Sequence, residues 1–498
     1  MAGGLILDLV ITNGRVIDPE TKLDAVRNVG IEDGQIAEVS EAGLTGHQVV
    51  DAKGLVVAPG FIDWHSHGQN NLADRVHAFD GVTTALELEG GILPIGRWYE
   101  IQAANKRVLN YGAASSWAFA RINTLKGIPL PTEPRPLGFS NFGHKKWPND
   151  IATGDQLAKI VGITEQGLIE GGIGIGMLPG YAPGTGYKEL LALQTLAAKH
   201  KVPSYWHDRA ESQEDAFSVA QAYGEVISFA AATGSWVHIC HLNSTSFHEI
   251  RPAAKVIQMA QMQGLNITVE AYPYGAGSTG IGAAFLAPEN LPRLGMTYES
   301  IEYQGRRLSE QSFKELRERE PGATVVVHFF ELPRDQALLD ISNLFPGGII
   351  ASDSMPWLST KTGKEVEDDV WPLPDDAFAH PRSAGTFARF FAQYVRERKV
   401  ISLSDAIAKA AYWPAKLMQK FVPQMSRKGR LQAGMDADVI VFDPATVQDC
   451  ATYTEPAQLS TGMKHVLVNG VSVIADGELV RDAKPGKPIR RSVTTVGA

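Results

Sequence analysis

The long middle section of this chain, residues 59–425, alternates short apolar runs with stretches of helical periodicity. Strands separated by helices imply repeated βα units and a parallel sheet. About eight such units fit within this length, which predicts an α/β fold of the (β/α)8 TIM-barrel type. In that fold, catalytic side chains lie at the carboxyl ends of the strands. The runs that we interpret as strands are 61–67, 83–91, 112–119, 172–178, 202–207, 236–241, 267–274, 324–330 and 348–353.

Both ends of the chain have a different pattern, with short β-like runs and turn signals. Asn13-Gly14 predicts a turn, and Asp33-Gly34 predicts a hairpin between two apolar runs. Residues 429–443 and 466–475 have the same strand-like character near the C-terminus. We therefore expect one small β-sandwich formed from both termini. The expected domains are 1–58 (N-terminal part of the sandwich), 59–425 ((β/α)8 barrel) and 426–498 (C-terminal part of the sandwich).

The composition fits a soluble globular protein with a sizeable core, since 44% of the 498 residues are hydrophobic and 20% are charged. No apolar run approaches the roughly 20 residues that span a membrane. The net charge is −9 and no basic cluster is present, so neither a membrane nor a nucleic-acid partner is expected. Two cysteines, Cys240 and Cys450, are too few for a disulfide framework. With an N-terminus that lacks a signal-peptide pattern, they favour a cytoplasmic location.

His65 and His67 follow a short apolar run and a Pro-Gly pair. If residues 61–67 form a strand, these two side chains share one face of it. Two imidazoles spaced in this way can converge on one metal ion. A lone His-x-His also occurs as ordinary polar residues at a strand end. The metal interpretation therefore depends on further ligands at the ends of other strands.

Such candidates occupy the ends of four other predicted strands. Glu87 and Glu89 share one face of the second strand, where a buried glutamate is unfavourable unless it is paired or binds a metal. We favour Glu89 because it lies nearer the strand end, with Glu87 as the alternative. Only one of His238 and His241 can face inward; position favours His241 and leaves His238 as a hydrogen-bonded core or outer-face histidine. The remaining candidates are His207, at the end of the fifth strand, and Asp353, at the end of the last.

Together these motifs resemble those of the amidohydrolase superfamily. Three flanking segments are similar to those of its D-aminoacylase (N-acyl-D-amino-acid deacylase) subfamily: a Gly-rich fourth strand, a Tyr-Pro-Tyr segment and a His-Pro-Arg segment. Residues 434–441 resemble the return strand that is common across the superfamily, and the resemblance covers nearly the whole chain. The three segments are Gly172–Gly184, Glu270–Thr279 and His380–Arg389.

The chain departs from the D-aminoacylase pattern at two positions of the metal site. Those enzymes usually carry a metal-bridging Cys after the second strand, where this chain has Glu89-Gly90-Gly91. A carboxylate is therefore expected to replace the thiolate. They often have Asp after the His-x-His motif, where this chain has Gly68-Gln69. The fourth strand also lacks the Lys that hydantoinase-like relatives carboxylate, which argues against that branch.

The resemblance implies a zinc-dependent hydrolase acting on non-peptide C–N bonds, with one or two Zn2+ ions per subunit. Asp353 would act as general base and then as general acid while a metal-activated hydroxide attacks the amide carbonyl. The implied ligands are His65, His67 and Asp353 for one ion, His207 and His241 for a second, and Glu89 as the bridge. The implied substrate-binding residues are Tyr272, Tyr274, Ser278 and Arg382.

Three interpretations of the function stay open. The first is a deacylase whose partner is a small-molecule amide that carries a carboxylate, such as an N-acyl (D-)amino acid. The second is a hydrolase of the same superfamily that acts on a cyclic amide, a carbamate or a lactone. The third is a non-catalytic barrel used for binding; it predicts lost ligands, whereas every expected position here holds one. Residues 354–380 are expected to form a loop over the barrel mouth, and a homo-oligomer is compatible with the sequence.

Overall fold

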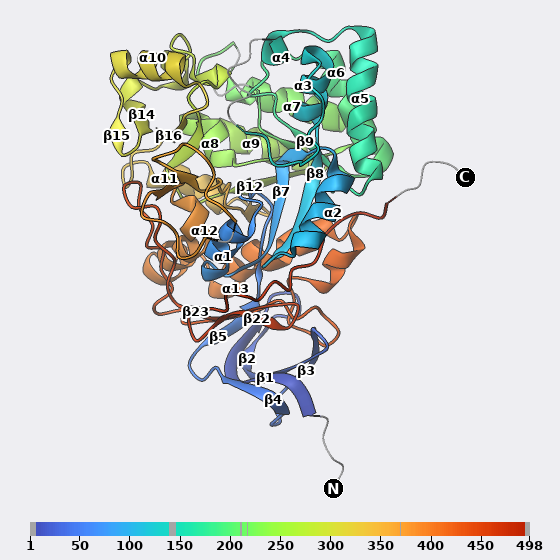
Figure 1. The fold of residues 1–498 in the computed structure, drawn as a ribbon, viewed down its shortest axis with the longest axis vertical. Helices are drawn as coiled ribbons and strands as arrows, with labels where there is room; N and C mark the ends of the chain where they lie inside the picture. Colours follow the sequence, from blue (N-terminus) through green and yellow to red (C-terminus); the bar gives the residue numbers. More distant parts are fainter. Residues whose placement is uncertain (1–5, 139–145, 210–211, 217, 369, 494–498) are drawn as a thin grey trace, which may run out of the picture.

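Eight parallel strands form a nearly closed barrel at the centre of the molecule (Figure 1). The structure, a computed structural model, describes residues 6–138, 146–209, 212–216, 218–368 and 370–493. The barrel confirms the predicted fold class. Its strands, in order, are β6 (Phe61–Asp63), β7 (Val82–Ile92), β8 (Asn110–Ser116), β9 (Ile175–Met177), β10 (Pro203–Trp206), β11 (Trp236–Ile239), β12 (Ile267–Ala271) and β17 (Ile349–Ile350).

The buried carboxylate of Asp63 joins the first strand of the barrel to the last. It accepts hydrogen bonds from the backbone N–H groups of Ser352, at 2.9 Å, and of His65, at 3.1 Å. Burial raises the pKa of Asp63 to about 7, although these hydrogen bonds favour the ionised form. Just beyond, Ser66 and Ser354 form a parallel bridge. These contacts hold the ends of β6 and β17 side by side, and so position the residues that follow both strands.

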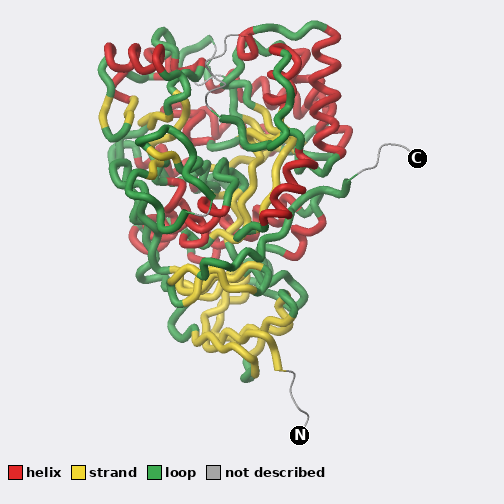
Figure 2. Tube along the Cα trace, viewed as in Figure 1, coloured by secondary structure: helices red, strands yellow, loops and turns green. Residues whose placement is uncertain are grey.

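Helices lie outside the barrel and cover its strands (Figure 2). In α9 (Ile250–Met262) the buried residues recur every three or four positions, so that one stripe faces the core while Met259 and Met262 face outward. The other helices are α1 (Asn71–Phe79), α2 (Ile95–Asn105), α3 (Trp117–Lys126), α4 (Lys146–Asn149), α5 (Gly154–Ile169), α6 (Tyr187–His200), α7 (Val219–Thr233), α8 (Leu242–Ser246), α10 (Glu310–Arg319), α11 (Gln336–Asn343), α12 (Arg382–Phe390), α13 (Leu403–Ile407) and α14 (Trp413–Met418).

Between β12 and β17 the chain forms a four-stranded antiparallel sheet. Residues 324–330, which we predicted as a barrel strand, belong to this sheet instead, because β16 (Thr324–His328) pairs with β13 (Ala276–Gly280) and β14 (Ile301–Tyr303). The prediction was wrong because a short apolar run fits any buried strand, whatever its partners. Figure 1 shows this sheet, completed by β15 (Arg306–Arg307), near α10 and far from the terminal strands.

Strands from both termini form one nine-stranded mixed sheet at the other end of the molecule (Figure 1). This confirms that the two chain ends build one β unit, and buried side chains from both ends share one core. The predicted hairpin at Asp33-Gly34 joins β2 to β3, and both turn residues have positive φ. The strands are β1 (Ile6–Asp18), β2 (Leu23–Glu32), β3 (Gln35–Ser40), β4 (Thr45–Asp51), β5 (Val56–Pro59), β20 (Val439–Phe442), β21 (Met463–Val468), β22 (Val471–Ala475) and β23 (Glu478–Leu479).

The turn predicted at Asn13-Gly14 is a bulge within the long strand β1. Asn13 has a φ of 60°, and the register between β1 and β2 shifts between Ile11 and Gly14. An Asn in the left-handed region serves a bulge as well as it serves a turn. The strand continues through the bulge because β2 pairs with it on both sides of the irregularity.

Lys428 neutralises two carboxylates where the terminal sheet meets the barrel. Its ammonium group lies 2.6 Å from Asp438 and 3.1 Å from Asp436. Asp438 also accepts a hydrogen bond, at 2.9 Å, from the side-chain amide of Asn110 in β8. Lys428 and Asp438 are each only 3% exposed. Removal of the ammonium group would therefore leave a buried carboxylate without its counter-charge.

We expect Lys428→Ala to lower the free energy of unfolding by about 3–5 kcal/mol, the usual loss when one partner of a buried ion pair is removed. The matched control is Arg427→Ala. Arg427 pairs with Asp436 at 3.1 Å, but its side chain is 51% exposed, so its loss should stay below about 1 kcal/mol. Urea unfolding followed by tryptophan fluorescence measures both variants. Equal losses would contradict the prediction.

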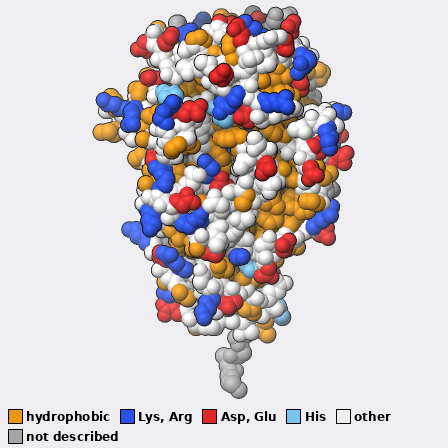
Figure 3. Space-filling view, turned by 90° about the vertical axis from the view of Figure 1, so that its left-hand side faces the viewer, with side chains coloured by type: hydrophobic (Ala, Val, Ile, Leu, Met, Phe, Trp, Pro, Cys, Tyr) orange, Lys and Arg blue, Asp and Glu red, His pale blue; other side chains and the backbone are white. Residues whose placement is uncertain are grey.

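The outer surface carries mixed charge on the face that Figure 3 shows. Lys and Arg side chains are interspersed there with Asp and Glu side chains and with apolar ones. In the described ranges, no helix combines the length and the apolar character that crossing a bilayer requires.

Candidate metal centre and active site

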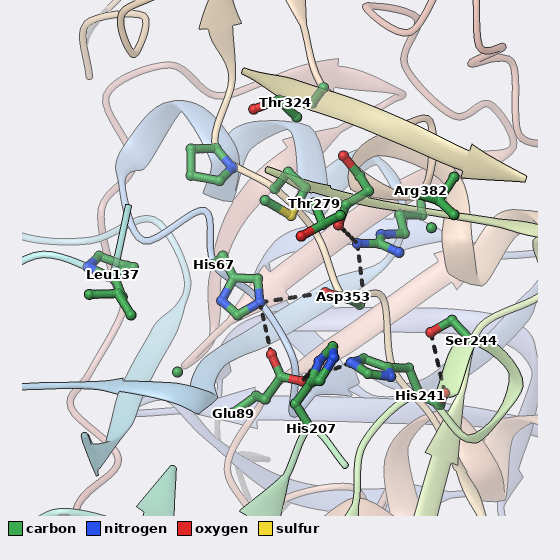
Figure 4. A pocket seen from close by; sticks show the side chains of 18 of the residues that line it. His67, Glu89, Leu137, His207, His241, Ser244, Thr279, Thr324, Asp353 and Arg382 are labelled. Carbon is green, nitrogen blue, oxygen red and sulfur yellow. Dashed lines mark hydrogen bonds and ion pairs between the residues drawn. The ribbon is translucent and has the colours of Figure 1, made fainter. Parts of the chain in front are cut away.

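The predicted ligands converge at the carboxyl end of the barrel (Figure 4). Parallel strands end at one rim, so residues that are far apart in the sequence meet there. Glu89 lies in β7 itself, and each of the other ligands lies one to four residues beyond its strand. The strands that carry them are β6 for His65 and His67, β10 for His207, β11 for His241 and β17 for Asp353.

Glu89 lies between two pairs of histidines and directs one carboxylate oxygen toward each pair. Its Oε1 lies 2.7 Å from Nε2 of His241 and 3.0 Å from Nδ1 of His207. Its Oε2 lies 3.3 Å from Nε2 of His65 and 3.6 Å from Nε2 of His67. Burial would raise the pKa of Glu89, but the nearby imidazoles hold it well below its ordinary value. The side chain is thus an ionised carboxylate shared by two sets of nitrogen donors.

Asp353 completes the group formed by His65 and His67. Its Oδ1 lies 3.3 Å from Nε2 of His65 and 3.5 Å from Nε2 of His67, and the two nitrogens are 3.2 Å apart. Its Oδ2 forms an ion pair with Nη2 of Arg382 at 2.9 Å. Burial would raise the pKa of Asp353, but the guanidinium of Arg382 and the imidazole of His65 hold it below its ordinary value. Asp353 is therefore ionised and able to accept a proton.

Two further carboxylates orient this first histidine pair from behind. Glu87 accepts a hydrogen bond from Nδ1 of His67 at 2.8 Å, and Glu270 accepts one from Nδ1 of His65. With a proton on each Nδ1, the Nε2 lone pairs of both rings point to the shared centre. Glu87 is also held by the backbone N–H of Gly90, at 3.0 Å. The geometry thus favours Glu89 as the ligand and Glu87 as the support of His67.

The sequence interpretation did not include Glu270 among the site residues. Glu270 lies in β12, within the Tyr-Pro-Tyr segment, and is only 1% exposed. A usable signal was present, because a glutamate in a buried barrel strand needs a partner. The same argument selected Glu87 and Glu89. His238 is a buried, hydrogen-bonded histidine as expected, and its Nε2 lies 3.0 Å from Glu270. The prediction that only one of His238 and His241 can face inward was wrong, because His241 lies beyond β11 with a left-handed backbone and also reaches the centre.

Two of the converging residues have a backbone in the left-handed region. The φ angle is 51° at Asp353 and 32° at His241. For residues other than Gly, this conformation is unfavourable by about 1–3 kcal/mol, and it persists where the surroundings impose it, often at functional sites. Both residues follow a barrel strand at the point where the chain turns, and both side chains face the barrel mouth (Figure 4).

Two groups of side chains have the composition and spacing of metal sites. In each group, three donor atoms lie within 4.8 Å of one another. Imidazole nitrogens and carboxylate oxygens suit Zn2+, which commonly takes three protein ligands at catalytic sites. Cys240 forms a third group within this distance, with His65 and Glu89, but burial raises the pKa of its thiol and so disfavours the thiolate that a metal would bind. The two groups that fit are His65, His67 and Asp353, and Glu89, His207 and His241.

A cavity of about 320 Å³ opens over these ligands. Arg382 contributes a guanidinium that is 1% exposed and stacks on Tyr272, with 4.7 Å between its central carbon and the ring centroid. Its Nε and Nη1 have no hydrogen-bond partner among the described residues. Such a group is suited to an anionic part of a ligand. Ser278 and Tyr272, both predicted to bind substrate, line the same cavity.

Tyr274 lies behind the cavity wall rather than in it. Its hydroxyl faces the carbonyl oxygen of Pro381 at 3.4 Å, and its ring stacks on Arg389 at 4.6 Å. The tyrosine therefore packs beneath the His-Pro-Arg segment that carries Arg382. Its predicted contact with the substrate is not supported by this position.

Three segments that are distant in the sequence form the cavity walls. Residues 354–380 contribute Met355, Leu358 and Phe378, in line with the expected loop over the mouth. The antiparallel sheet contributes side chains from β13 and β16, and residues 136–138 close another side. Of these last two walls only Ser278 in β13 was predicted, because the positions of β16 and of residues 136–138 depend on how the insertions fold back over the barrel.

Comparison with known proteins places these observations in a family. The sequence model of the amidohydrolase family matches residues 48–172 and 172–474. A D-aminoacylase of Alcaligenes xylosoxydans xylosoxydans is 27% identical over 495 residues, with 94% of each chain covered. An N-acyl-D-glutamate deacylase of the same organism is 26% identical over 515 residues, which covers 99% of this chain and 98% of the relative.

Solved structures share the fold over the same length. The N-acyl-D-glutamate deacylase from Bordetella bronchiseptica, complexed with zinc and a phosphonate mimic of the tetrahedral intermediate, superposes with a TM-score of 0.76. It is 24% identical, and the match covers 98% of this chain and 100% of the other. A D-aminoacylase crystal structure has a TM-score of 0.75 at 22% identity, with 98% and 100% coverage.

Proposed function

The chain belongs to the amidohydrolase family, and on that basis we propose that it is a zinc-dependent deacylase that hydrolyses the amide bond of an N-acyl amino acid. The observation that carries the proposal is the carboxylate of Glu89 shared between two ligand groups, with Asp353 and Arg382 beside it at one cavity. The full-length relatives are D-aminoacylases and N-acyl-D-amino-acid deacylases, which supports this substrate class. The zinc in the B. bronchiseptica deacylase supports the choice of metal.

In this proposal the two ligand groups would each hold one divalent ion, and such ions would lower the pKa of water and polarise a carbonyl oxygen. Asp353 takes the proton of the attacking water and then delivers it to the nitrogen of the scissile amide. That delivery matters because an amine leaves very poorly as an anion. The ion pair with Arg382 holds the carboxylate of Asp353 in place between the two events.

Arg382 is also the proposed anchor of the substrate carboxylate. Its Nη2 is engaged by Asp353, while Nε and Nη1 are left without a protein partner among the described residues. A guanidinium with free donors can pair with a carboxylate through two hydrogen bonds. The apolar side chains of the cavity walls, such as Phe285, Val327 and Phe329, leave room for an acyl group or an apolar side chain.

We expect Arg382→Gln to abolish the preference for a substrate carboxylate. The measurement is the ratio of kcat/KM for an N-acetyl amino acid to that for its uncharged carboxamide. This ratio should fall by about 30-fold or more, which corresponds to a loss of at least about 2 kcal/mol when a buried charge pair is broken. If the substitution also disturbs Asp353, turnover of both substrates falls by the same factor, and this factor cancels in the ratio.

Arg389→Gln is the matched control for this prediction. Arg389 lies on the same helix, α12, and stacks on Tyr274 much as Arg382 stacks on Tyr272. It does not line the cavity described here. The ratio should therefore stay close to that of the unchanged protein. A similar fall in both variants would show that Arg382 does not contact the carboxylate.

A substrate panel tests the proposal as a whole. It contains N-acetyl derivatives of neutral and acidic amino acids in both D and L forms, together with a hydantoin, a dihydropyrimidine and a lactone. The proposal is supported if the zinc-containing protein hydrolyses an N-acyl amino acid and if this activity is lost when a chelator removes the zinc. Turnover of the cyclic compounds alone would overturn it in favour of another hydrolase of the family.

A further inference from the structure

A chain of hydrogen bonds leads from the metal centre away from the cavity, into the interior of the barrel. Glu270 accepts from Nδ1 of His65 and lies 3.0 Å from Nε2 of His238 through its other oxygen. Nδ1 of His238 lies 2.8 Å from the hydroxyl of Thr268, which in turn accepts from Nε1 of Trp236 at 2.9 Å. We call these four residues, from Trp236 to Glu270, the supporting chain of His65.

The direction of the hydrogen bonds in the supporting chain follows from the carboxylate of Glu270, which can only accept. His65 therefore donates to it from Nδ1, and His238 donates to it from Nε2. In a neutral imidazole the second nitrogen is an acceptor, so Nδ1 of His238 accepts the proton of the Thr268 hydroxyl. That hydroxyl uses a lone pair to accept from the indole N–H of Trp236. His65 therefore carries its proton on Nδ1 and presents the lone pair of Nε2 to the metal centre.

We propose that Thr268 and His238 are positioning residues of the metal centre, which act through Glu270 to hold His65 in the ligating tautomer and orientation. This inference rests on the proposed metal centre and extends it by two layers of side chains. Outer partners of metal-bound histidines typically change metal affinity by about 10–100-fold when they are removed. The effect should be confined to the ion held by His65, because the supporting chain does not touch the donor atoms of His207 or His241.

The location of the supporting chain excludes a direct contact with substrate. None of its four residues is among the described residues that line the cavity. Glu270 is 1% exposed and His238 is fully buried. The ring of His238 also packs against two aromatic rings that contact each other, with centroid distances of 5.0 Å to Trp64 and 5.8 Å to Tyr205.

Packing alone would not require these side chains. A polar network in a barrel interior is tolerated only when every member is satisfied, and an apolar side chain would fill the same space at lower risk. Here the exchange of hydrogen bonds is complete from Trp236 to His65. The network ends on His65 of the proposed metal centre, so its effect is to fix the tautomer and orientation of that histidine.

Thr268→Val tests the proposal with the smallest change of shape. The variant keeps the volume of the side chain but removes the hydroxyl that donates to His238, so His238 loses the contact that selects its tautomer. Zinc content is measured by elemental analysis after equilibration with graded concentrations of a chelator. We expect the variant to lose one of its two zinc equivalents at a chelator concentration about tenfold lower than the concentration that removes it from the unchanged protein.

Thr164→Val serves as the control, because Thr164 is a buried threonine of α5 that donates to a backbone carbonyl outside the supporting chain. Its zinc retention should be unchanged. Equal retention in Thr268→Val, with two equivalents bound to the unchanged protein, would overturn the inference and leave the proposed function intact. Absence of zinc from the unchanged protein would instead overturn the proposed function.

A second experiment reads the tautomer directly. The protein has 13 histidines, and 15N labelling of histidine alone gives a spectrum in which His238→Gln identifies the signals of His238. We expect the signals of His238 to show a proton on Nε2, the nitrogen that faces Glu270, and none on Nδ1, which faces Thr268. A proton on Nδ1 of His238 would overturn the inference.

The identity of the group at position 238 separates positioning from simple packing. His238→Gln retains an N–H donor that can reach Glu270, whereas His238→Leu retains only bulk. We expect zinc affinity to be largely kept in the first variant and to fall about tenfold in the second. Equal affinities in the two variants would show that only the volume of His238 matters.

Discussion

Asp353→Asn should bind zinc as the unchanged protein does, yet lose at least about 100-fold in kcat, the lower range of the contribution of general acid–base catalysis. The amide oxygen of Asn can remain beside His65 and His67, but the amide cannot accept a proton from water or return it to the leaving nitrogen. The measurements are zinc content by elemental analysis and steady-state hydrolysis of an N-acyl amino acid.

Asp443→Asn is the control for this variant. Asp443 lies beyond β20 in the terminal sheet and accepts hydrogen bonds only locally, from Ala445 and Thr446, among the described residues. The same change of acid to amide there should leave kcat unchanged. If Asp353→Asn hydrolysed the substrate at a near-normal rate with zinc bound, Asp353 would not be the proton carrier. Loss of the zinc equivalent assigned to His65 and His67 would show instead that its main role is to bind metal.

Glu89→Ala and Glu87→Ala should separate the bridging ligand from the side chain that supports a ligand. Glu89 directs its two oxygens toward different histidine pairs, so its removal should reduce zinc from two equivalents to one or none, and activity with it. Glu87 contacts only Nδ1 of His67 and two backbone N–H groups among the described residues. Its removal should keep the stoichiometry and weaken one site by about 10–100-fold.

Glu89 and Glu87 are well matched for this comparison, since both lie in β7 and both are buried. The expected contrast is therefore not an effect of location in the fold. Loss of metal from Glu87→Ala alone would assign the bridge to Glu87 and contradict the present geometry. One zinc equivalent in the unchanged protein and in both variants would mean a mononuclear centre.

The convergence of the ligand candidates could be predicted because a barrel repeats one local rule. Each candidate follows or ends an apolar run, and parallel strands deliver such residues to a common rim. The rule needs no knowledge of contacts, so His65, His207 and Asp353 could be assigned from their positions alone. It also favoured Glu89 over Glu87, because the residue nearer the carboxyl end of a strand lies nearer the rim.

The same local rule failed wherever the partner of a segment decided its role. Residues 324–330 have the composition of a barrel strand, yet they pair within the antiparallel insertion. Asn13-Gly14 has the composition of a turn, yet β2 holds the strand together across it. Tyr274 shares a motif with Tyr272, but only Tyr272 reaches the cavity. In the first two cases, long-range strand pairing selected one of two conformations that the local sequence permits.

The amino-acid sequence by itself determined the barrel, the shared terminal β unit and the positions of the metal-ligand candidates, because periodicity and turn residues act over a few neighbours. Tertiary structure alone decided which side chains stand behind those ligands and which segments wall the cavity. Glu270 meets His65 across 205 positions of the chain. Such a meeting depends on the strand order and register of the closed barrel, which no local pattern records.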